Sequence, residues 1–447
     1  MMARFPSPRA IRTLQQLRRD PLALLADLAT RGDVAPFRAG PQAMLLVNHP
    51  TLIREVLVTH NRAFVKGRVL ERAKRLLGEG LLTSEGEVHL RQRRLIQPAF
   101  HRQRIAAYGA AMVAAAAARS ARWADGAVLD MSRELQAITL RVVGETLFSA
   151  ETEADAADVF AAMHDLVAMF DLAVLPLADW LMHLPLPPVR RFQAAKARLD
   201  AIVYRIIAER RANPVDRGDL LSMLLMAVDH EGDGYRMTDT QLRDELLTIF
   251  LAGHETTANA LAWALYLLAQ HPAIAAALES ELDTVLGDRL PTVADLPALR
   301  YTEWLFAEAL RLYPPAWLIG RRAIAPVTIG DMRVAPDTIV LMSPWLMHHD
   351  PRFFPDPYRC DPLRHTPEAQ AARPKFAFFP FGGGPRNCIG EPFAWMEGVL
   401  VLATLAHRWR FEPVPEHPIA LQTGITLRPR YGMPLRLRLR QSIVSRA

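Results

Sequence analysis

The sequence predicts a mainly α-helical fold with a minor β-sheet region. Three observations support this prediction. Helical patterning dominates the 447 residues, strand patterns are few and lie toward the two ends, and no Gly/Ser-rich linker or fixed-period repeat divides the chain. A sheet built from distant segments requires these segments to come together. We therefore expect residues 1–447 to form a single domain, with residues 1–40 as a poorly defined N-terminal segment.

The helix expected over 239–270 is apolar on nearly every face in its second half, so it is predicted to run through the protein interior. Gly253, His254 and Glu255 interrupt it, which argues against a membrane helix. Further helices are expected over 103–123, 153–173 and 190–212, and the connector between the last two contains helix-breaking prolines at Pro176, Pro185, Pro187 and Pro188.

Strands are expected in three places. Residues 43–48 form a short apolar run, and 327–343 has the pattern of strand, turn and strand. Residues 435–440 alternate strictly between leucine and arginine, which predicts a strand with one buried face.

The composition limits the class of protein. With 53 basic and 47 acidic residues, the formal net charge is +6, and arginine is spread along the chain without any nucleic-acid-binding signature. The only cysteines are Cys360 and Cys388, which favours a reducing cytoplasm over a disulfide framework. The early apolar run at 22–26 is too short for a signal peptide or a membrane span. We expect a soluble, cytoplasmic protein that is a monomer.

The most specific feature is the string FGGGPRNCIG at residues 381–390. Three consecutive glycines allow the backbone to approach something large and flat. Arg386 brings a positive charge toward Cys388, and a helix is predicted to begin at Gly390. A nearby cation and a helix N-terminus both lower the pKa of a thiol, so Cys388 is predicted to be a thiolate suited to metal binding.

The string matches, position by position, the heme-binding signature of the cytochrome P450 family, which the chain resembles from roughly residue 40 to residue 440. The resemblance implies the single-domain P450 fold and heme b as the cofactor. It also implies that Cys388 is the axial ligand of the heme iron, that Arg386 pairs with a heme propionate, and that Phe381 and Gly390 flank the sulfur. Cys360 lacks such surroundings and is expected to be an ordinary buried residue.

A second string, AGHETT at 252–257, lies in the long predicted helix. The Thr256 hydroxyl is placed to bond the carbonyl of Ala252 four residues earlier. Glu255 is unusual in an interior helix, because buried carboxylates need partners. The string is similar to the oxygen-activation motif of the family, which implies that Thr256 and Glu255 deliver protons. A zinc-protease HExxH interpretation fails because residue 258 is alanine.

Glu308 and Arg311, three residues apart, resemble the ExxR motif of the family. The third member of this structural triad is expected to be Arg364. The sequence departs from the family pattern around it, since Cys360 and His365 stand where aromatics are common and Leu363 stands where an acid is common.

His89 and Arg93, four residues apart, resemble the family's pair of propionate contacts. Arg321 matches a further propionate contact, and the adjacent Arg322 is an alternative for that role. Arginine suits this function because it offers carboxylates two parallel donors.

The resemblance implies a monooxygenase that activates dioxygen and inserts one oxygen atom into a lipophilic substrate, by hydroxylation or epoxidation. Fatty acids, terpenoids, steroids and polyketides all remain open. Candidate pocket residues are mostly apolar and lie in the long helix, after the ExxR helix, in the connector 174–188 and in Thr423–Ile425; the individual candidates are Phe250, Ala252, Pro315, Ala316, Trp317, Leu318 and Ile319.

Three other functions fit less well. A peroxide-driven enzyme does not need the Glu255–Thr256 pair, a heme sensor would carry an output domain, and a nucleotide-dependent dehydrogenase would need GxGxxG spacing, which FGGGPRN lacks.

The chain contains no flavin, nicotinamide or iron–sulfur motif, so no fused reductase or ferredoxin domain is expected. A separate ferredoxin or flavodoxin, with its reductase, is then the expected electron donor. Its docking patch is predicted on basic residues near the Cys388 loop and the His89 helix, namely Arg91, Arg94, Arg102, Arg104, Arg373 and Lys375.

Overall fold

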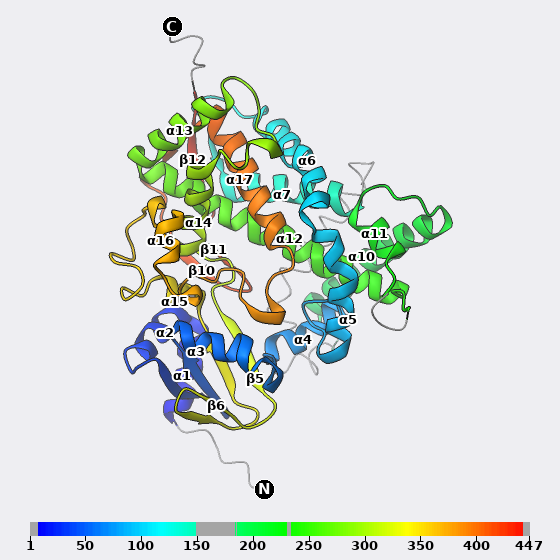
Figure 1. Cartoon of the computed structure of the whole chain (residues 1–447), viewed down its shortest axis with the longest axis vertical. Helices are drawn as coiled ribbons and strands as arrows, with labels where there is room; N and C mark the ends of the chain where they lie inside the picture. The colour runs from blue at the N-terminus through cyan, green and yellow to red at the C-terminus, as the bar shows by residue number, and fades with distance from the viewer. Residues whose placement is uncertain (1–7, 149–183, 185, 230–233, 441–447) are drawn as a thin grey trace.

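The computed structural model describes residues 8–148, 184, 186–229 and 234–440. Helices make up most of the described chain, and the largest sheet lies at the end that carries α1–α3 (Figure 1). The long helix α12, Asp239–Gln270, runs through the middle of the helical part, and α17, Glu391–Arg408, packs against it. The mainly α fold with a minor sheet region is confirmed.

The other helices are these: α1 Pro8–Arg19, α2 Pro21–Ala29, α3 Pro50–Arg54, α4 Arg68–Leu77, α5 Gly86–Ile96, α6 Arg102–Ser120, α7 Met131–Phe148, α10 Pro187–Ala212, α11 Leu220–Met226, α13 Pro272–Leu286, α14 Arg300–Leu312, α15 Pro344–His348 and α16 Pro367–Ala371. The helices predicted over 103–123 and 190–212 are confirmed as α6 and α10, whereas the one predicted over 153–173 lies outside the described residues. Pro187 and Pro188 form the first turn of α10, where a proline needs no amide hydrogen bond, so at these positions they start a helix.

A capping box and a proline explain where the long helix α12 begins and ends. Thr238 and Gln241 form a capping box, in which the Thr238 hydroxyl accepts from the Gln241 amide and the Gln241 side chain accepts from the Thr238 amide. The helix ends at Gln270, and Pro272 opens α13. Among the described residues no single helix is long and apolar enough to span a membrane, and α12 and α13 pass that test only as a pair bent by 110°.

The largest sheet has the strand order β1-β2-β8-β5-β3, in which β2 and β8 are parallel and the other pairs antiparallel. A second sheet has the order β4-β12-β9, and β6-β7 and β10-β11 are two-stranded. The strands are β1 Val34–Ala39, β2 Gln42–Val47, β3 Phe64–Lys66, β4 Val128–Asp130, β5 Ile319–Ala323, β6 Val327–Ile329, β7 Met332–Val334, β8 Ile339–Met342, β9 Trp409–Pro413, β10 Leu421–Thr423, β11 Leu427–Pro429 and β12 Pro434–Leu439.

All three predicted strand regions contain strands, and one of them differs from the expected arrangement. The segment 327–343 forms three strands, because β8 leaves the β6–β7 hairpin and joins the largest sheet between β2 and β5. Within the segment 1–40, the described residues from Pro8 onward form α1, α2 and β1; β1 is the edge strand of this sheet, and both helices pack against it.

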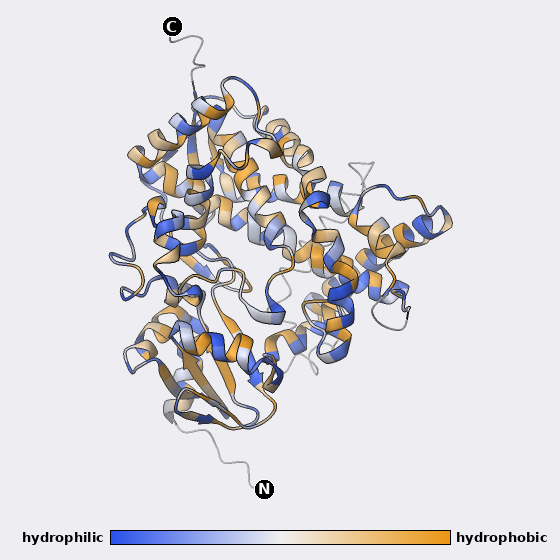
Figure 2. Ribbon diagram, in the orientation of Figure 1, coloured by the Kyte–Doolittle hydropathy of each residue, from blue (hydrophilic) through white to orange (hydrophobic). Residues whose placement is uncertain are grey.

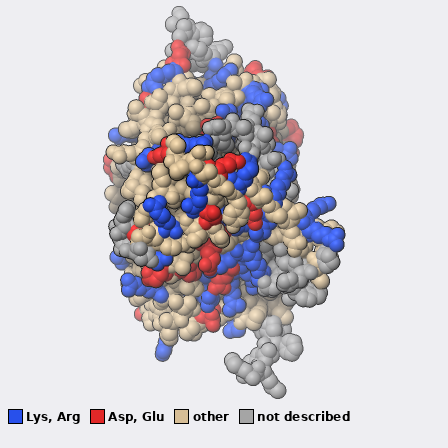
Figure 3. Space-filling model, turned by 90° about the vertical axis from the view of Figure 1, so that its right-hand side faces the viewer, with Lys and Arg blue, Asp and Glu red and all other residues tan. Residues whose placement is uncertain are grey.

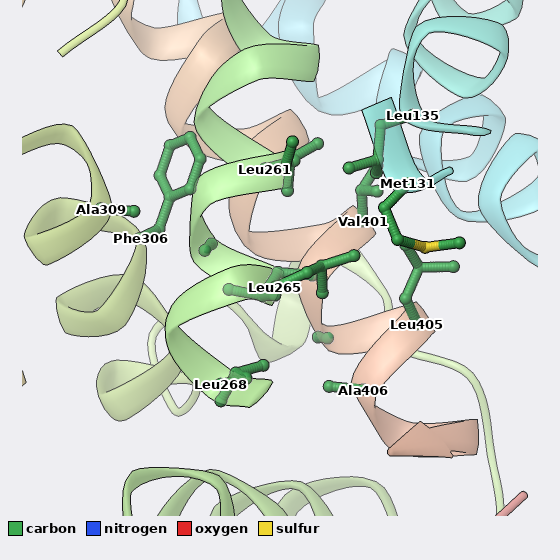
Figure 4. Close-up of a cluster of buried hydrophobic side chains, with 14 of the residues drawn as sticks. Met131, Leu135, Leu261, Leu265, Leu268, Phe306, Ala309, Val401, Leu405 and Ala406 are labelled. Atoms are coloured by element: carbon green, nitrogen blue, oxygen red, sulfur yellow. The ribbon is translucent and has the colours of Figure 1, made fainter. Parts of the chain in front are cut away.

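The main core lies where α7, α12, α14 and α17 meet, and Figure 4 shows side chains from these four helices converging there. Hydrophobic residues gather on the inner sides of these helices in Figure 2. Gly398 of α17 allows this packing, since a Cβ there would lie 2.3 Å from the ring of Phe306. The core thereby fixes α17, and with it the loop that precedes α17, against the middle of α12.

Candidate functional site

The segment 381–390 forms a tight loop in front of α17. The Cys388 amide donates to the carbonyl of Phe381 over 3.0 Å, and the Asn387 amide donates to the carbonyl of Gly384 over 3.1 Å. Gly384 has a φ of 69°, and a Cβ there would lie 2.0 Å from the Leu57 carbonyl oxygen. Glycine is therefore required at this position for two independent reasons, conformation and contact.

The Cys388 sulfur accepts hydrogen bonds from the amides of Gly390 and Glu391, at the start of α17. Burial among neighbouring groups raises the pKa of the Cys388 thiol to about 11, although the residue keeps some accessible surface. The prediction of a lowered pKa is therefore wrong for the thiol as it stands in this structure. Burial outweighs the two amides, and the cation that acts on the sulfur is Arg93, because Arg386 pairs with Glu85.

Cys360, the other cysteine, is buried in the main core. Burial raises the pKa of its thiol to about 12. Its expected role as an ordinary core residue fits this position.

The middle of α12 also keeps accessible surface. Ala252 is exposed although Leu251 and Glu255 beside it are buried. The Thr256 hydroxyl donates to the Ala252 carbonyl over 2.7 Å, which confirms the bond expected from the sequence. The His254 carbonyl accepts a further bond from the Thr139 hydroxyl of α7, over 3.0 Å.

Glu255 has partners that the sequence did not predict. Its carboxylate accepts from the Thr426 hydroxyl over 2.7 Å and lies 3.9 Å from the guanidinium of Arg428. Asn259, one turn further along α12, donates to the same hydroxyl over 3.1 Å. The β10–β11 hairpin region therefore holds this carboxylate, while Arg428 is only half-buried and connects it toward the surface.

Glu308 and Arg311 of α14 are both fully buried and form a two-pronged ion pair with N–O distances of 2.7 Å. Arg311 also donates to the carbonyls of His348, Pro357 and Arg359. Burial raises the pKa of Glu308, but Arg311 and His365 outweigh it and hold this pKa at about 2. The pair thus ties α14 to the segment that precedes the Cys388 loop.

The expected third member, Arg364, forms an ion pair with Glu308, and a further residue joins the group. Arg364 approaches Glu308 only to 3.8 Å and makes its side-chain hydrogen bond to the Asp356 carbonyl. The His365 Nε2 lies 2.9 Å from Glu308. Sequence reasoning missed this role of His365, although the residue stood out as a departure from the family pattern.

The four predicted propionate contacts lie in one region and influence one another. The pKa of His89 is lowered to about 3 by burial and by the charges of Arg386, Lys66, Arg93 and Arg321, in that order. Arg93 donates to the backbone and side-chain oxygens of Asn387 over 2.9 and 2.6 Å. Lys66, which the sequence analysis did not single out, belongs to the same group.

The structure distinguishes Arg321 from Arg322. Arg322 pairs with Glu71 and Asp337 on the surface side of β5. Within the described residues, Arg321 donates only to the carbonyl of Gly320, over 3.0 Å, and burial lowers its pKa to about 10. Of the two, Arg321 is the cation available to a bound anion.

The candidate pocket residues fall into two groups. Phe250, Pro315 and Trp317 are packed in the protein, and the Trp317 indole N–H donates to the Gly424 carbonyl over 3.1 Å. The residues that keep accessible surface are Ala252, Ala316, Leu318 and Ile319. The side chain of Ile319 lies 3.6 Å from where a Cβ on Gly382 would be, so it borders the cysteine loop. Thr423 ends β10 and Ile425 is exposed, whereas most of the connector 174–188 lies outside the described residues.

Several residues of the predicted docking patch are occupied within the protein. Arg94 pairs with the buried Asp229, and Arg91 stacks over Tyr235. Arg104 lies 3.9 Å from Asp216. The free-standing patch expected from the sequence is therefore reduced, because tertiary contacts that the sequence does not reveal engage its members.

The two basic residues near the cysteine loop differ as well. Arg373 bonds the carbonyl of Arg364 and stacks over Phe354, so it points into the protein. Lys375 is exposed, and its charge acts on Glu391 at the start of α17. The Arg102 side chain lies outside the described part of the structure.

Comparison with known proteins places these features in a family. A family model described as Cytochrome P450 matches residues 6–433. Cyclooctatin synthase from Streptomyces melanosporofaciens is 42% identical, over 93% of this chain and 89% of that protein. Cyclooctat-9-en-7-ol 5-monooxygenase from the same organism is 42% identical, over 89% of this chain and 86% of that protein. Pentalenene oxygenase from Streptomyces avermitilis is 38% identical, over 95% of this chain and 93% of that protein.

Proposed function

The chain belongs to the cytochrome P450 family and is a monooxygenase, and from this premise we propose that it inserts one oxygen atom into a carbocyclic terpenoid, with Cys388 as the axial ligand of heme b. The observation that carries the site assignment is the Cys388 loop. It presents an accessible sulfur, bonded by two backbone amides, beside a group of buried and half-buried cations.

The described residues fit a heme. Its two propionates need cations, and Arg321 carries a half-buried guanidinium without an ion pair to a carboxylate in the described chain. Its flat ring needs a close backbone, and Gly382 offers one without a side chain, whereas Gly383 and Gly384 pack against Phe376 and Leu57. We assign the propionates to His89, Arg93, Arg321 and Arg386, and we place Phe381 and Gly390 beside the sulfur. When bound, heme supplies reductive activation of dioxygen, and thiolate ligation favours O–O cleavage.

The protein then supplies proton delivery and orientation. Thr256 holds its hydroxyl proton against the Ala252 carbonyl, at a point where α12 keeps accessible surface. We infer that this hydroxyl holds a water molecule and passes protons inward. Glu255 and Arg428 form the outer part of the route, because Arg428 reaches the surface and lies 3.9 Å from the Glu255 carboxylate.

Two arguments support the proposed substrate class: the apolar side chains of the candidate pocket and the names of two relatives. Ala252, Leu318 and Ile319 offer only apolar surface, which suits a hydrocarbon skeleton. Two of the relatives carry names that state cyclooctat-9-en-7-ol and pentalenene as their substrates. We therefore favour terpenoids over fatty acids, steroids and polyketides.

The heme ligand is tested by carbon monoxide binding. The reduced wild-type protein with carbon monoxide should show the red-shifted Soret band of thiolate ligation. Cys388→Ala should lose this band, and Cys360→Ala, which changes a core thiol, should keep it. Retention of the band in Cys388→Ala would overturn the assignment.

The substrate is tested by titration of the ferric protein with pentalenene, a long-chain fatty acid and a steroid. We expect the terpenoid to shift the spin state at the lowest concentration. Turnover with a ferredoxin system should then give a product that carries one oxygen atom from labelled dioxygen. A spin-state response to the fatty acid or steroid alone would contradict the proposed class.

A separate ferredoxin or flavodoxin is the proposed electron donor, approaching the face that carries Lys375. The two cysteines are both free thiols, which fits the reducing conditions of a cytoplasm.

A further inference from the structure

Lys66 is a buried cation placed directly opposite a second cation, the half-buried Arg321. It ends β3, and the antiparallel register pairs it with Arg321 of β5, so both side chains leave the sheet on one face. Lys66 is only 6% exposed. In the described part of the chain, neither residue has an ion pair with a carboxylate. Two like charges at this spacing are unfavourable unless an anion joins them.

The ammonium of Lys66 organises the segment that holds Arg386. Its Nζ donates to the carbonyls of Leu81 and Ser84, over 2.7 and 3.0 Å. Arg386 donates to the same Ser84 carbonyl over 2.9 Å and pairs with Glu85. The backbone amide of Lys66 also donates to Glu85, over 2.6 Å. Lys66 and Arg386 are therefore fixed through two shared partners.

The charge of this region is unbalanced. Among the described residues, Lys66, Arg321 and Arg386 share one close carboxylate, Glu85. Glu245 of α12 lies close as well and accepts from the Leu81 amide over 2.8 Å, but burial raises its pKa to about 8. The excess of cations suits a dianionic group such as the two propionates of a heme.

We propose that Lys66 is a positioning residue of the heme site: its ammonium fixes the segment 81–85, sets the position of Arg386 and adds positive charge to the propionate-binding group. This inference rests on the proposed heme binding and deepens it. One N–H of Lys66 remains beyond the two carbonyl bonds, since an ammonium carries three donors.

The protonation of Lys66 depends on whether an anion such as a heme propionate is bound beside it. Burial, Arg386 and Arg321 lower its pKa to about 7, while Glu85 and Glu245 act in the opposite direction. A bound dianion raises this pKa, so binding takes up a proton when the solution pH lies above about 7. His89 does not titrate in this range, because its pKa is about 3. Heme retention by the wild type should therefore weaken as the pH rises.

The test measures heme transfer from the purified holoprotein to excess apomyoglobin, between roughly pH 6 and pH 8.5. Lys66→Met should release heme about tenfold or more faster than wild type near pH 6, as expected for loss of an outer partner of a bound group. Lys66→Arg keeps a cation that does not titrate, so it should retain heme and weaken less with rising pH than wild type; Glu245, with its pKa of about 8, still titrates in this range. Lys74→Met, which removes a half-exposed lysine paired with Glu79, is the matched control and should behave as wild type.

Each outcome decides the question. Wild-type release rates in Lys66→Met, or the same pH response in Lys66→Arg as in wild type, would overturn the inference. If Lys66→Met does not fold, the pH response of Lys66→Arg remains the deciding measurement. A wild-type protein without a thiolate-type carbon monoxide spectrum would overturn the proposed function itself.

Discussion

Thr256 and Glu255 are adjacent in α12, but their side chains meet different parts of the protein. The Thr256 hydroxyl bonds within its own helix, whereas the Glu255 carboxylate is held by Thr426, far along the chain. The two residues therefore contribute differently to one proton route. Loss of Thr256 removes the inner group and leaves the packing of Glu255 in place.

We predict that Thr256→Ala still consumes reducing equivalents but forms more peroxide per product, because protons reach bound oxygen less effectively. The measurement is the ratio of peroxide to product at matched consumption of the electron donor. Thr284→Ala is a suitable control, since Thr284 makes the same bond to a carbonyl four residues earlier, in α13. Equal ratios in wild type and Thr256→Ala would exclude the relay role.

The partners of Glu308 include one, His365, that the family resemblance did not imply. From the neighbouring segment it accepts a backbone hydrogen bond from the Asp361 amide and a side-chain bond from His365, whereas Arg364 forms only an ion pair at 3.8 Å. His365→Leu should lower the free energy of unfolding by about 1–3 kcal/mol, because a fully buried carboxylate loses a partner. Arg364→Leu should cost less, since no hydrogen bond to Glu308 is lost. Urea unfolding of both variants tests this order, and a larger loss for Arg364→Leu would reverse our assignment.

The contact of α12 with α17 contains a fully buried acid, Glu397. Burial raises its pKa to about 8, and the Thr257 hydroxyl of α12 only partly opposes this shift. The folded-state pKa thus lies above the unfolded value of about 4.3. The folded state holds the proton more tightly, so Glu397 lowers stability increasingly as the pH rises between these two values.

Glu397→Gln should therefore be more stable than wild type near pH 8, by on the order of 1–3 kcal/mol, and little changed near pH 4.5. Unfolding measured across this pH range gives the difference curve. Glu416→Gln, at an exposed position, should leave the wild-type curve unchanged. A Glu397→Gln curve that runs parallel to wild type would show that Glu397 does not titrate in this range.

Local sequence predicted those features that depend on local geometry. The Cys388 loop, the Thr256 bond and the Glu308–Arg311 pair were all found because their residues are close in sequence. The roles of Thr426, His365 and Lys66 were missed, since each depends on a partner brought near by folding. A lysine or histidine in a sequence is usually a surface residue, and only burial distinguishes these two.

At the scale of the whole molecule, surface charge is mixed. Figure 3 shows basic and acidic side chains interspersed over the face that carries α5 and α11. A mild net charge of +6 distributed in this way gives no strong long-range field. Docking of an electron donor must then depend on a few residues close to the cysteine loop.

Lys375 is the best placed of these residues. It is exposed, and its charge acts on Glu391, three residues after Cys388. We predict that Lys375→Glu slows reduction of the ferric protein by an acidic ferredoxin about three- to tenfold at low salt, because a charge at the rim of an interface mainly changes the association rate. The difference should disappear as salt rises, since the Debye length falls from about 10 Å at 0.1 M to about 3 Å at 1 M.

Stopped-flow reduction across an ionic-strength series measures this effect, with substrate affinity as a check on the fold. Arg333→Glu is the matched control, because Arg333 is an exposed cation in the β6–β7 hairpin, outside the segment from Lys375 to Glu391. It should reduce at the wild-type rate. If Lys375→Glu and Arg333→Glu slow reduction equally, the donor responds to net charge alone. If neither changes the rate at any salt concentration, the donor docks through apolar contacts or at another face.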